Sequence, residues 1–236
     1  MRVFNSLLDQ RSDRNRAPSR QRKLFLASLA ILCAGAWFVH GTRATAEPVR
    51  IVAFGDSLTA GLGLGSQHAF PSKLAAALRA KGHEVTVANA GVSGDTTSAA
   101  LARIDWSVPA GTEAVILQFG ANDAFRGVPP AIVSKNLDEI IRRLKARNVE
   151  VLLAGMYAPR NLGSDYYSAF DAIYPALAKK HGLLLIPFFL ENVAGVAKLN
   201  QPDGVHPTAV GIDEMVKVAL PSAEALIQRV RARKAS

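Results

Sequence analysis

The feature that most constrains the fold of this chain is a set of five short apolar runs. Each run is followed by a segment with helical periodicity. The runs are rich in β-branched and aliphatic residues, as buried strands are, and cover 49–54, 84–89, 113–119, 149–154 and 183–186. Helices are predicted over 68–81, 96–104, 131–147, 165–180 and 208–231. Strands that alternate with helices form a parallel sheet covered on both faces. We therefore predict one α/β domain over 47–236, a three-layer α/β/α sandwich.

Two prolines are expected to disturb these helices. Proline lacks the N–H that an interior helical position donates, and its ring clashes with the preceding turn. We expect Pro175 to kink or restart the helix over 165–180, and Pro221 to interrupt the terminal helix. The most regular helix is predicted over 131–147, where the apolar residues share one stripe: Val133, Leu137, Ile140, Ile141 and Leu144.

The first 46 residues differ in composition from the rest of the chain. A basic segment precedes an apolar run over 24–39, and Ala44-Thr45-Ala46 follows that run. These are the parts of a secretory signal peptide, so residues 1–46 are predicted to be one, with cleavage after Ala46. The apolar run is shorter than the ~20 residues that a spanning helix needs. An uncleaved membrane anchor is the alternative, and the predicted location is periplasmic or secreted.

The basic charge and the single cysteine also belong to this leader. The chain has a formal net charge of +9, but residues 1–46 hold eight basic and only two acidic residues, which leaves +3 for the remainder. Nothing in the remainder suggests a face that binds phosphates, so no nucleic-acid partner is predicted. Cys33 is the only cysteine. A mature chain that lacks it has no disulfide, and its stability must come from its core.

Four short polar blocks follow the predicted strands or lie near the end of the chain. They cover 55–58, 89–95, 120–123 and 203–207. The strands of a parallel sheet all end at one edge, and ligands of open α/β sheets bind there. Blocks that are distant in sequence are therefore expected to meet in space.

The residue types in these blocks fit acyl transfer. A serine hydroxyl such as that of Ser57 is a weak nucleophile that needs a base within hydrogen-bond reach, and His206 can supply it. Asp203 lies three residues earlier, where its carboxylate can reach the other ring nitrogen. The alternative interpretations are a turn serine that caps a helix and a surface histidine beside a proline. The other histidines have no acid at a suitable spacing within such a loop.

A tetrahedral intermediate also needs proton donors aimed at its oxyanion. The chain offers the backbone N–H of Ser57, a backbone N–H in the block 89–95, and the carboxamide of Asn122. Glycine lets a backbone approach closely, and asparagine is an uncharged donor that does not compete as a base. Taken singly, a turn glycine and a capping asparagine are the better explanations of these residues; their joint occurrence after successive strands favours the functional one. The remaining acids of the blocks are expected to act as helix caps and structural acceptors: Asp56, Asp95 and Asp123.

Taken together, the four blocks resemble those of the GDSL or SGNH hydrolases, a family named for its Ser, Gly, Asn and His residues. The likeness runs from about 51 to 220 and is greatest to the branch of bacterial thioesterases with arylesterase and lysophospholipase activity. It includes 93–96, 172–175 and 185–189. The third block has Ala121 where close relatives often have a second glycine, which predicts a less free backbone there.

The resemblance implies a flavodoxin-like sheet of five parallel strands and a serine acyl-ester hydrolase. By position, Ser57, Asp203 and His206 resemble the catalytic triad, and Ser57, Gly94 and Asn122 the oxyanion hole. Gly94 is the match because it directly precedes the Asp-Thr pair. The implied substrates are short to medium acyl esters or thioesters, lysophospholipids included. No cofactor and no metal are implied.

Three other functions remain as alternatives: a carbohydrate O-acetyl esterase of the same fold, a secreted binding protein without turnover, and a metal-dependent phosphoesterase. The last is poorly supplied with ligands, because the blocks hold a single histidine and no D-x-H or H-x-H pair occurs. The apolar residues of 124–129 and 161–167 are expected either to line an acyl channel or to pack these loops onto the sheet. Neither outcome is favoured by the sequence.

Overall fold

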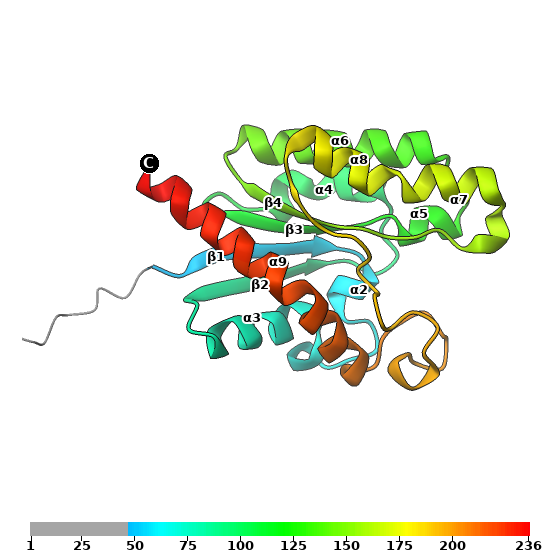
Figure 1. The fold of residues 1–236 in the computed structure, drawn as a ribbon, viewed down its shortest axis with the longest axis horizontal. Helices are drawn as coiled ribbons and strands as arrows, with labels where there is room; N and C mark the ends of the chain where they lie inside the picture. Colours follow the sequence, from blue (N-terminus) through cyan, green and yellow to red (C-terminus); the bar gives the residue numbers. More distant parts are fainter. Residues whose placement is uncertain (1–46) are drawn as a thin grey trace, which may run out of the picture. The chain divides into compact units, whose positions relative to one another are not determined.

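Five parallel strands form the centre of the protein, in the spatial order β2-β1-β3-β4-β5 (Figure 1). The computed structural model describes residues 47–236, so the predicted signal peptide lies outside the described residues and stays a prediction. The strands are β1 (Val49–Gly55), β2 (Val85–Gly91), β3 (Ala114–Gln118), β4 (Glu150–Ala154) and β5 (Leu184–Ile186). This is the flavodoxin-like order, so the predicted fold is confirmed.

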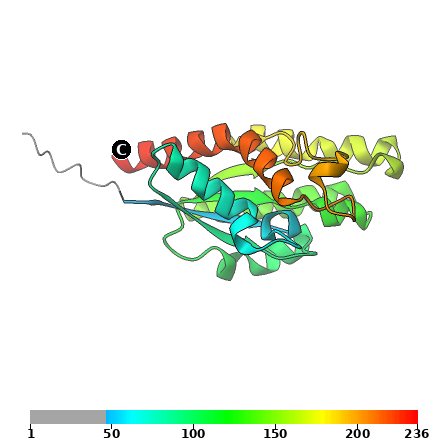
Figure 2. The same cartoon turned by 90° about the horizontal axis from the view of Figure 1, so that it is seen from below.

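Helices cover both faces of the sheet. The α-helices are α2 (Ser57–Ala60), α3 (Phe70–Ala80), α4 (Thr97–Ser107), α5 (Ala121–Phe125), α6 (Pro130–Ala146), α7 (Ser164–Asp171), α8 (Ile173–His181) and α9 (Ala209–Ala235). Three short 3-10 helices cover Ser66–His68, Arg160–Leu162 and Ala197–Leu199. α3 and α9 pack against each other on one face (Figure 2), and α6 packs between α4 and α8 on the other. Within residues 47–236, no helix combines the length and the apolar character needed to cross a membrane.

The central strands carry the core, because they are covered on both faces. All five residues of β3 are buried, and its Val115 and Leu117 have no exposed surface. A strand enclosed in this way is a continuous apolar run rather than an alternating one. The apolar stripe predicted for the helix over 131–147 is also confirmed, since all of its members are fully buried in α6: Val133, Leu137, Ile140, Ile141 and Leu144.

The two prolines behave differently. The segment before Pro175 is split at Ala172 into α7 and α8, so the predicted restart is confirmed. The predicted interruption at Pro221 is wrong, because α9 continues through it. Pro221 and Lys217, whose carbonyl loses its helical donor, are both exposed, so that carbonyl stays on the solvent side. The apolar face of α9 is buried on both sides of the proline, and this burial offsets the ~3 kcal/mol that an interior proline costs.

Candidate active site

Ser57 lies at the carboxyl edge of the sheet, directly after β1. It is the first residue of α2, and only 7% of its surface is exposed. Asp56 caps this short helix, since its Oδ1 accepts a hydrogen bond of 3.0 Å from the backbone N–H of Leu58. A Cβ on Gly55 would lie 2.1 Å from Thr59 Oγ1, so only glycine lets the strand end this close to the helix. The turn therefore holds the Ser57 hydroxyl in one place.

The structure brings His206 and Asp203 to this serine. His206 Nε2 lies 2.9 Å from Ser57 Oγ, although the two residues are 149 positions apart in the sequence. His206 Nδ1 lies 2.7 Å from Asp203 Oδ2. All three side chains thus form one continuous chain of hydrogen-bond contacts.

The electrostatics of Asp203 decide how these contacts are oriented. Hydrogen bonds from the backbone N–H and the ring of His206, and from the backbone N–H of Val205, lower the pKa of the Asp203 carboxyl to about 2. An ionised carboxylate only accepts hydrogen bonds, so the neutral imidazole carries its proton on Nδ1. His206 Nε2 is then left to accept the hydroxyl proton of Ser57.

The loop that carries His206 is held by its own backbone and by the neighbouring Ser57 segment. Asn200 pairs with Pro207 in an isolated antiparallel bridge, and the backbone N–H of Gln201 donates to the His206 carbonyl at 2.7 Å. The Gln201 side chain donates to the carbonyl of Leu62, also at 2.7 Å. Leu62 follows α2, so this contact fixes the histidine loop to the segment that carries the serine.

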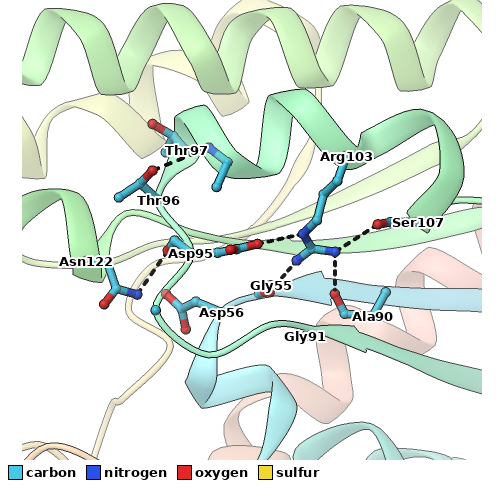
Figure 3. A network of polar contacts seen from close by, with 12 residues as sticks. Gly55, Asp56, Ala90, Gly91, Asp95, Thr96, Thr97, Arg103, Ser107 and Asn122 are labelled. Carbon is cyan, nitrogen blue, oxygen red and sulfur yellow. Dashed lines mark hydrogen bonds and ion pairs between the residues drawn. The ribbon is translucent and has the colours of Figure 1, made fainter.

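The candidate oxyanion donors come from the segments that follow β1, β2 and β3. Asn122 Nδ2 donates to the carbonyl of Asp95 at 3.0 Å (Figure 3), which ties the asparagine to the residue next to Gly94. A carboxamide has two hydrogens, so Asn122 keeps one for an oxyanion. Gly94 has a φ of +85°, a conformation that favours glycine. The Ser57 N–H lies in the first turn of α2, where N–H groups have no acceptor within the helix.

Most of the candidate site residues open onto one cavity of about 670 Å³. Ser57, Asn122, Asp203 and His206 line it; Gly94 does not, and it joins the site through the contact between Asn122 and Asp95. In the part of the chain that the structure describes, the acidic and histidine side chains form no group of three or more that could hold a metal ion.

The three remaining acids act as predicted, as a cap and as structural acceptors. Asp56 caps α2, and Asp95 Oδ2 accepts from Arg103 Nε at 2.6 Å. Asp123 accepts from the backbone N–H of Thr97 at 2.9 Å and from its hydroxyl at 2.7 Å. Asp56 and Asp123 are both fully buried, and burial raises the pKa of both carboxyls, that of Asp56 to about 6.

We expect Asp56→Asn to weaken the pH dependence of folding stability. Between pH ~4 and ~6 the folded wild type holds a proton on Asp56 that the unfolded chain has released, so its free energy of unfolding falls as pH rises. The variant keeps an oxygen for the Leu58 N–H but has no charge to bury. Urea unfolding should therefore show that the free energy of unfolding of the variant, relative to that of the wild type, rises from pH 4 to pH 7. The rise is on the order of 3 kcal/mol at most. An equal difference between the two proteins at both pH values would contradict this.

The loops 124–129 and 161–167 take different roles. Only the first of them lines the cavity. Phe125 lines the cavity and is 58% exposed. The segment 161–167 does not line it, and Tyr166 instead donates its hydroxyl to the Val128 carbonyl at 2.8 Å, which packs the two loops together.

Most of the cavity wall was not predicted from the sequence. Met156, Tyr157, Phe188 and Leu190 line the cavity, and the Tyr157 and Phe188 rings stack with their centroids 4.5 Å apart. Their position in the sequence could have indicated them, because these residues follow β4 and β5 at the same edge as the four blocks.

The short helices α2 and α5 were also missed, since four or five residues are too few to show helical periodicity.

Comparison with known proteins identifies the family. Residues 53–213 match the model of the GDSL-like lipase/acylhydrolase family. The chain belongs to this family. A GDSL-like hydrolase similar to it is esterase TesA of Pseudomonas aeruginosa, 34% identical over 186 residues, which cover 78% of this chain and 92% of that protein. Another is thioesterase 1/protease 1/lysophospholipase L1 of Escherichia coli K12, 37% identical over 166 residues, with 70% and 78% covered.

Solved structures of GDSL-like hydrolases agree with the fold. The crystal structure of AlinE4, a SGNH-hydrolase family esterase, matches with a TM-score of 0.65 and 46% identity over 76% of this chain and 96% of that one. The predicted family is therefore confirmed, and with it the predicted class of enzyme, a carboxylic-ester hydrolase.

Ala121 does not restrict the backbone of this family member in the way that its sequence suggested. It is the first residue of α5, a position with ordinary helical geometry. The unusual conformation falls on Gly120, with a φ of +120°. A Cβ there would lie 2.1 Å from the hydroxyl of Tyr174, which donates to the Phe119 carbonyl. One glycine thus suffices in the third block.

Proposed function

We propose that this protein hydrolyses short to medium acyl esters or thioesters through an acyl-enzyme on Ser57. His206 is the general base and Asp203 orients it. The observation that carries the proposal is the pair of contacts made by the His206 ring, at 2.9 Å to Ser57 Oγ and 2.7 Å to Asp203 Oδ2. A nucleophile, a base and an orienting acid in one line are what serine hydrolysis requires.

In this mechanism, His206 Nε2 takes the hydroxyl proton while Ser57 Oγ attacks the substrate carbonyl. The resulting imidazolium is stabilised by Asp203, which the lowered pKa keeps ionised. The oxyanion accepts hydrogen bonds from the backbone N–H groups of Ser57 and Gly94 and from the free Asn122 hydrogen. The imidazolium then protonates the leaving alcohol or thiol, and a water molecule, activated by His206 in its turn, releases the acid.

The cavity wall supports an apolar acyl or aryl group as the substrate part next to Ser57. Met156, Tyr157, Phe188 and Leu190 supply aliphatic and aromatic surface. The names of the relatives agree with such substrates: an esterase, an arylesterase and a thioesterase 1/protease 1/lysophospholipase L1. Thioesters, aryl esters and lysophospholipids are therefore the proposed substrate classes, ahead of acetylated sugars.

The proposal is tested by hydrolysis of p-nitrophenyl butyrate with and without EDTA and after treatment with an organophosphonate. We expect turnover to survive EDTA and to be lost after phosphonylation of the serine. Loss on treatment with EDTA would support the metal-dependent alternative. Tight binding of an acyl ester without turnover would support the binding protein. A panel of acyl-thioesters, aryl esters, lysophospholipids and acetylated sugars then ranks the substrate classes.

Asn122→Ala is expected to lower kcat by about 10²-fold while KM changes less than about threefold. The carboxamide is assigned to a charge that develops only in the transition state, and losing one such donor typically costs ~10²–10³ in rate. Steady-state kinetics on p-nitrophenyl butyrate measures this. Asn136→Ala is the matched control, because that asparagine contacts Thr97 and Ser98 rather than the cavity. A rise in KM with kcat unchanged would remove Asn122 from the oxyanion hole.

Phe125→Ala is expected to change chain-length preference more than acetyl-ester hydrolysis. An acyl chain long enough to touch the ring loses apolar contact, at about 0.8 kcal/mol per buried CH₂ group, whereas an acetyl group does not reach it. We expect kcat/KM for p-nitrophenyl octanoate to fall about 3- to 10-fold and that for the acetate to change less than about twofold. Trp106→Ala is the control, an exposed aromatic outside the cavity lining. Equal losses on both esters would contradict the assignment.

The proposed location is the periplasm or the extracellular space, on the strength of the signal-peptide pattern in residues 1–46. Export with cleavage leaves Glu47 as the first residue, which mass spectrometry of the secreted or periplasmic protein detects. A full-length chain in the membrane fraction would favour the uncleaved anchor instead.

A further inference from the structure

Arg103 of α4 lies buried behind the candidate oxyanion hole, with only 6% of its surface exposed. A buried guanidinium is costly unless its hydrogens find acceptors. All three of its nitrogens do so (Figure 3). Nε donates to Asp95 Oδ2 at 2.6 Å, Nη1 to the Ala90 carbonyl at 3.0 Å and the Ser107 hydroxyl at 2.9 Å, and Nη2 to the Gly55 carbonyl at 2.9 Å.

Two of these acceptors, the Gly55 carbonyl and the Asp95 carboxylate, belong to the segments that carry the proposed oxyanion donors. Gly55 ends β1, two residues before Ser57, and Asp95 follows Gly94 directly. The carbonyl of the same Asp95 accepts from Asn122. One side chain is thus connected to the segments of all three donors, while the backbone N–H of Val92 adds a second bond to the Gly55 carbonyl at 3.0 Å.

The helix that carries Arg103 also reaches the third block. At the start of α4, Thr97 donates its backbone N–H and its hydroxyl to Asp123, the neighbour of Asn122. Contacts therefore run from Asp95 to Arg103, along α4 to Thr97 and on to Asp123, and from its neighbour Asn122 back to Asp95, the residue after Gly94. The Arg103 guanidinium also lies over the Phe54 ring, 4.5 Å from its centroid, which limits its movement further.

We propose that Arg103 is a positioning residue that aligns the Gly94 and Asn122 donors with Ser57, through Asp95 and the Gly55 carbonyl. This inference rests on the proposed function, because the donors matter only where an oxyanion forms. The guanidinium is suited to this role, since it offers several N–H groups in one rigid plane, whereas an ammonium is a single point charge on a flexible stem. Lysine at this position keeps the charge for Asp95 but does not hold both strand carbonyls.

The first test is Arg103→Lys, with Ser107→Ala as its matched control. Ser107→Ala removes one hydrogen bond of Arg103 and leaves its contacts with the donor segments. A displacement of about 1 Å can cost a reaction on the order of 10²-fold, so we expect Arg103→Lys to lower kcat 10- to 100-fold and to change KM less than threefold. Ser107→Ala should stay within about twofold of the wild type. Active-site titration with an organophosphonate and the thermal midpoint correct for any unfolded fraction.

A double-mutant cycle with Asn122→Ala separates alignment from a purely structural role. If Arg103 acts through the oxyanion donors, its loss matters less once Asn122 is gone, so the double variant loses clearly less kcat than the product of the single losses. A double variant that loses the full product, or Arg103→Lys with a lowered midpoint but unchanged kcat per titrated site, overturns the inference.

Asp95→Asn is the second variant, used where Arg103→Lys does not fold. It keeps the backbone carbonyl for Asn122 and the other bonds of Arg103 but weakens the contact at 2.6 Å. We expect a 3- to 30-fold loss of kcat, again coupled to Asn122→Ala, and an unchanged kcat overturns the inference. A wild type without turnover instead defeats the proposed function. Asn122→Ala without an effect on kcat removes Asn122 from the oxyanion hole, and overturns this inference with it. If the wild type turns over and the Arg103 variant has an unchanged kcat, this inference alone is defeated.

Discussion

Ser57→Ala is expected to reduce ester hydrolysis by about 10⁶-fold, with the fold unchanged. No other hydroxyl is in contact with His206 among the described residues, so the loss of one oxygen removes the nucleophile. The Asp56 cap and the hydrogen bond between His206 and Asp203 do not depend on that oxygen. The structural cost is therefore one hydrogen bond, about 1 kcal/mol, or a few degrees in Tm.

The measurement is the hydrolysis of p-nitrophenyl butyrate at high enzyme concentration, with circular dichroism to check the fold. Ser66→Ala is the control, since Ser66 lies in the 3-10 helix after α2 and does not line the cavity. Its activity should equal that of the wild type. Turnover by Ser57→Ala above about a thousandth of the wild-type rate would mean that another group attacks the substrate.

His206→Ala is the second large effect that we expect, with kcat lower by about 10⁴- to 10⁶-fold. Without the imidazole, no group at 2.9 Å takes the Ser57 proton, and a neutral hydroxyl is a weak nucleophile. Asp203 stays in place but has no ring nitrogen to accept from. The rate of inactivation by an organophosphonate should fall with kcat, because it uses the same activated oxygen.

The matched control is His181→Gln. His181 also pairs with an aspartate, with Nε2 at 2.6 Å from Asp138 Oδ1, but the pair lies between α6 and α8, outside the cavity lining. This substitution removes a contact outside the cavity and should leave kcat within about twofold. Equal losses of kcat in the two histidine variants would contradict the role assigned to His206.

Much of the fold could be predicted from the sequence, because the patterns that indicate its strands and helices lie within short stretches of the chain. A strand such as β3 is covered on both faces and is therefore a continuous apolar run, which is visible without a structure. The four polar blocks stand next to such runs, and the geometry of parallel strands then implies that they meet at one edge. In the structure, His206 contacts Ser57, Asp203 contacts His206, and Asn122 contacts Asp95, the residue after Gly94.

What could not be predicted depends on contacts between distant segments. Pro221 was expected to break α9, because the apolar burial that carries the helix past it is a tertiary effect. Arg103 was not recognised, since its Nη2 contact with the Gly55 carbonyl spans 48 positions and nothing in the local sequence marks it. The stacked Tyr157 and Phe188 of the cavity wall were missed for the same reason, as they come from the segments after two different strands.

The most direct test of the central claim is to trap the acyl-enzyme. The protein is mixed with p-nitrophenyl butyrate, quenched in acid during the first turnovers, digested and analysed by mass spectrometry. The mechanism predicts a butyryl group on the peptide that contains Ser57, and none on the same peptide from Ser57→Ala. A butyryl group on another residue, or rapid release of p-nitrophenol with no acylated Ser57 at any time, would contradict it.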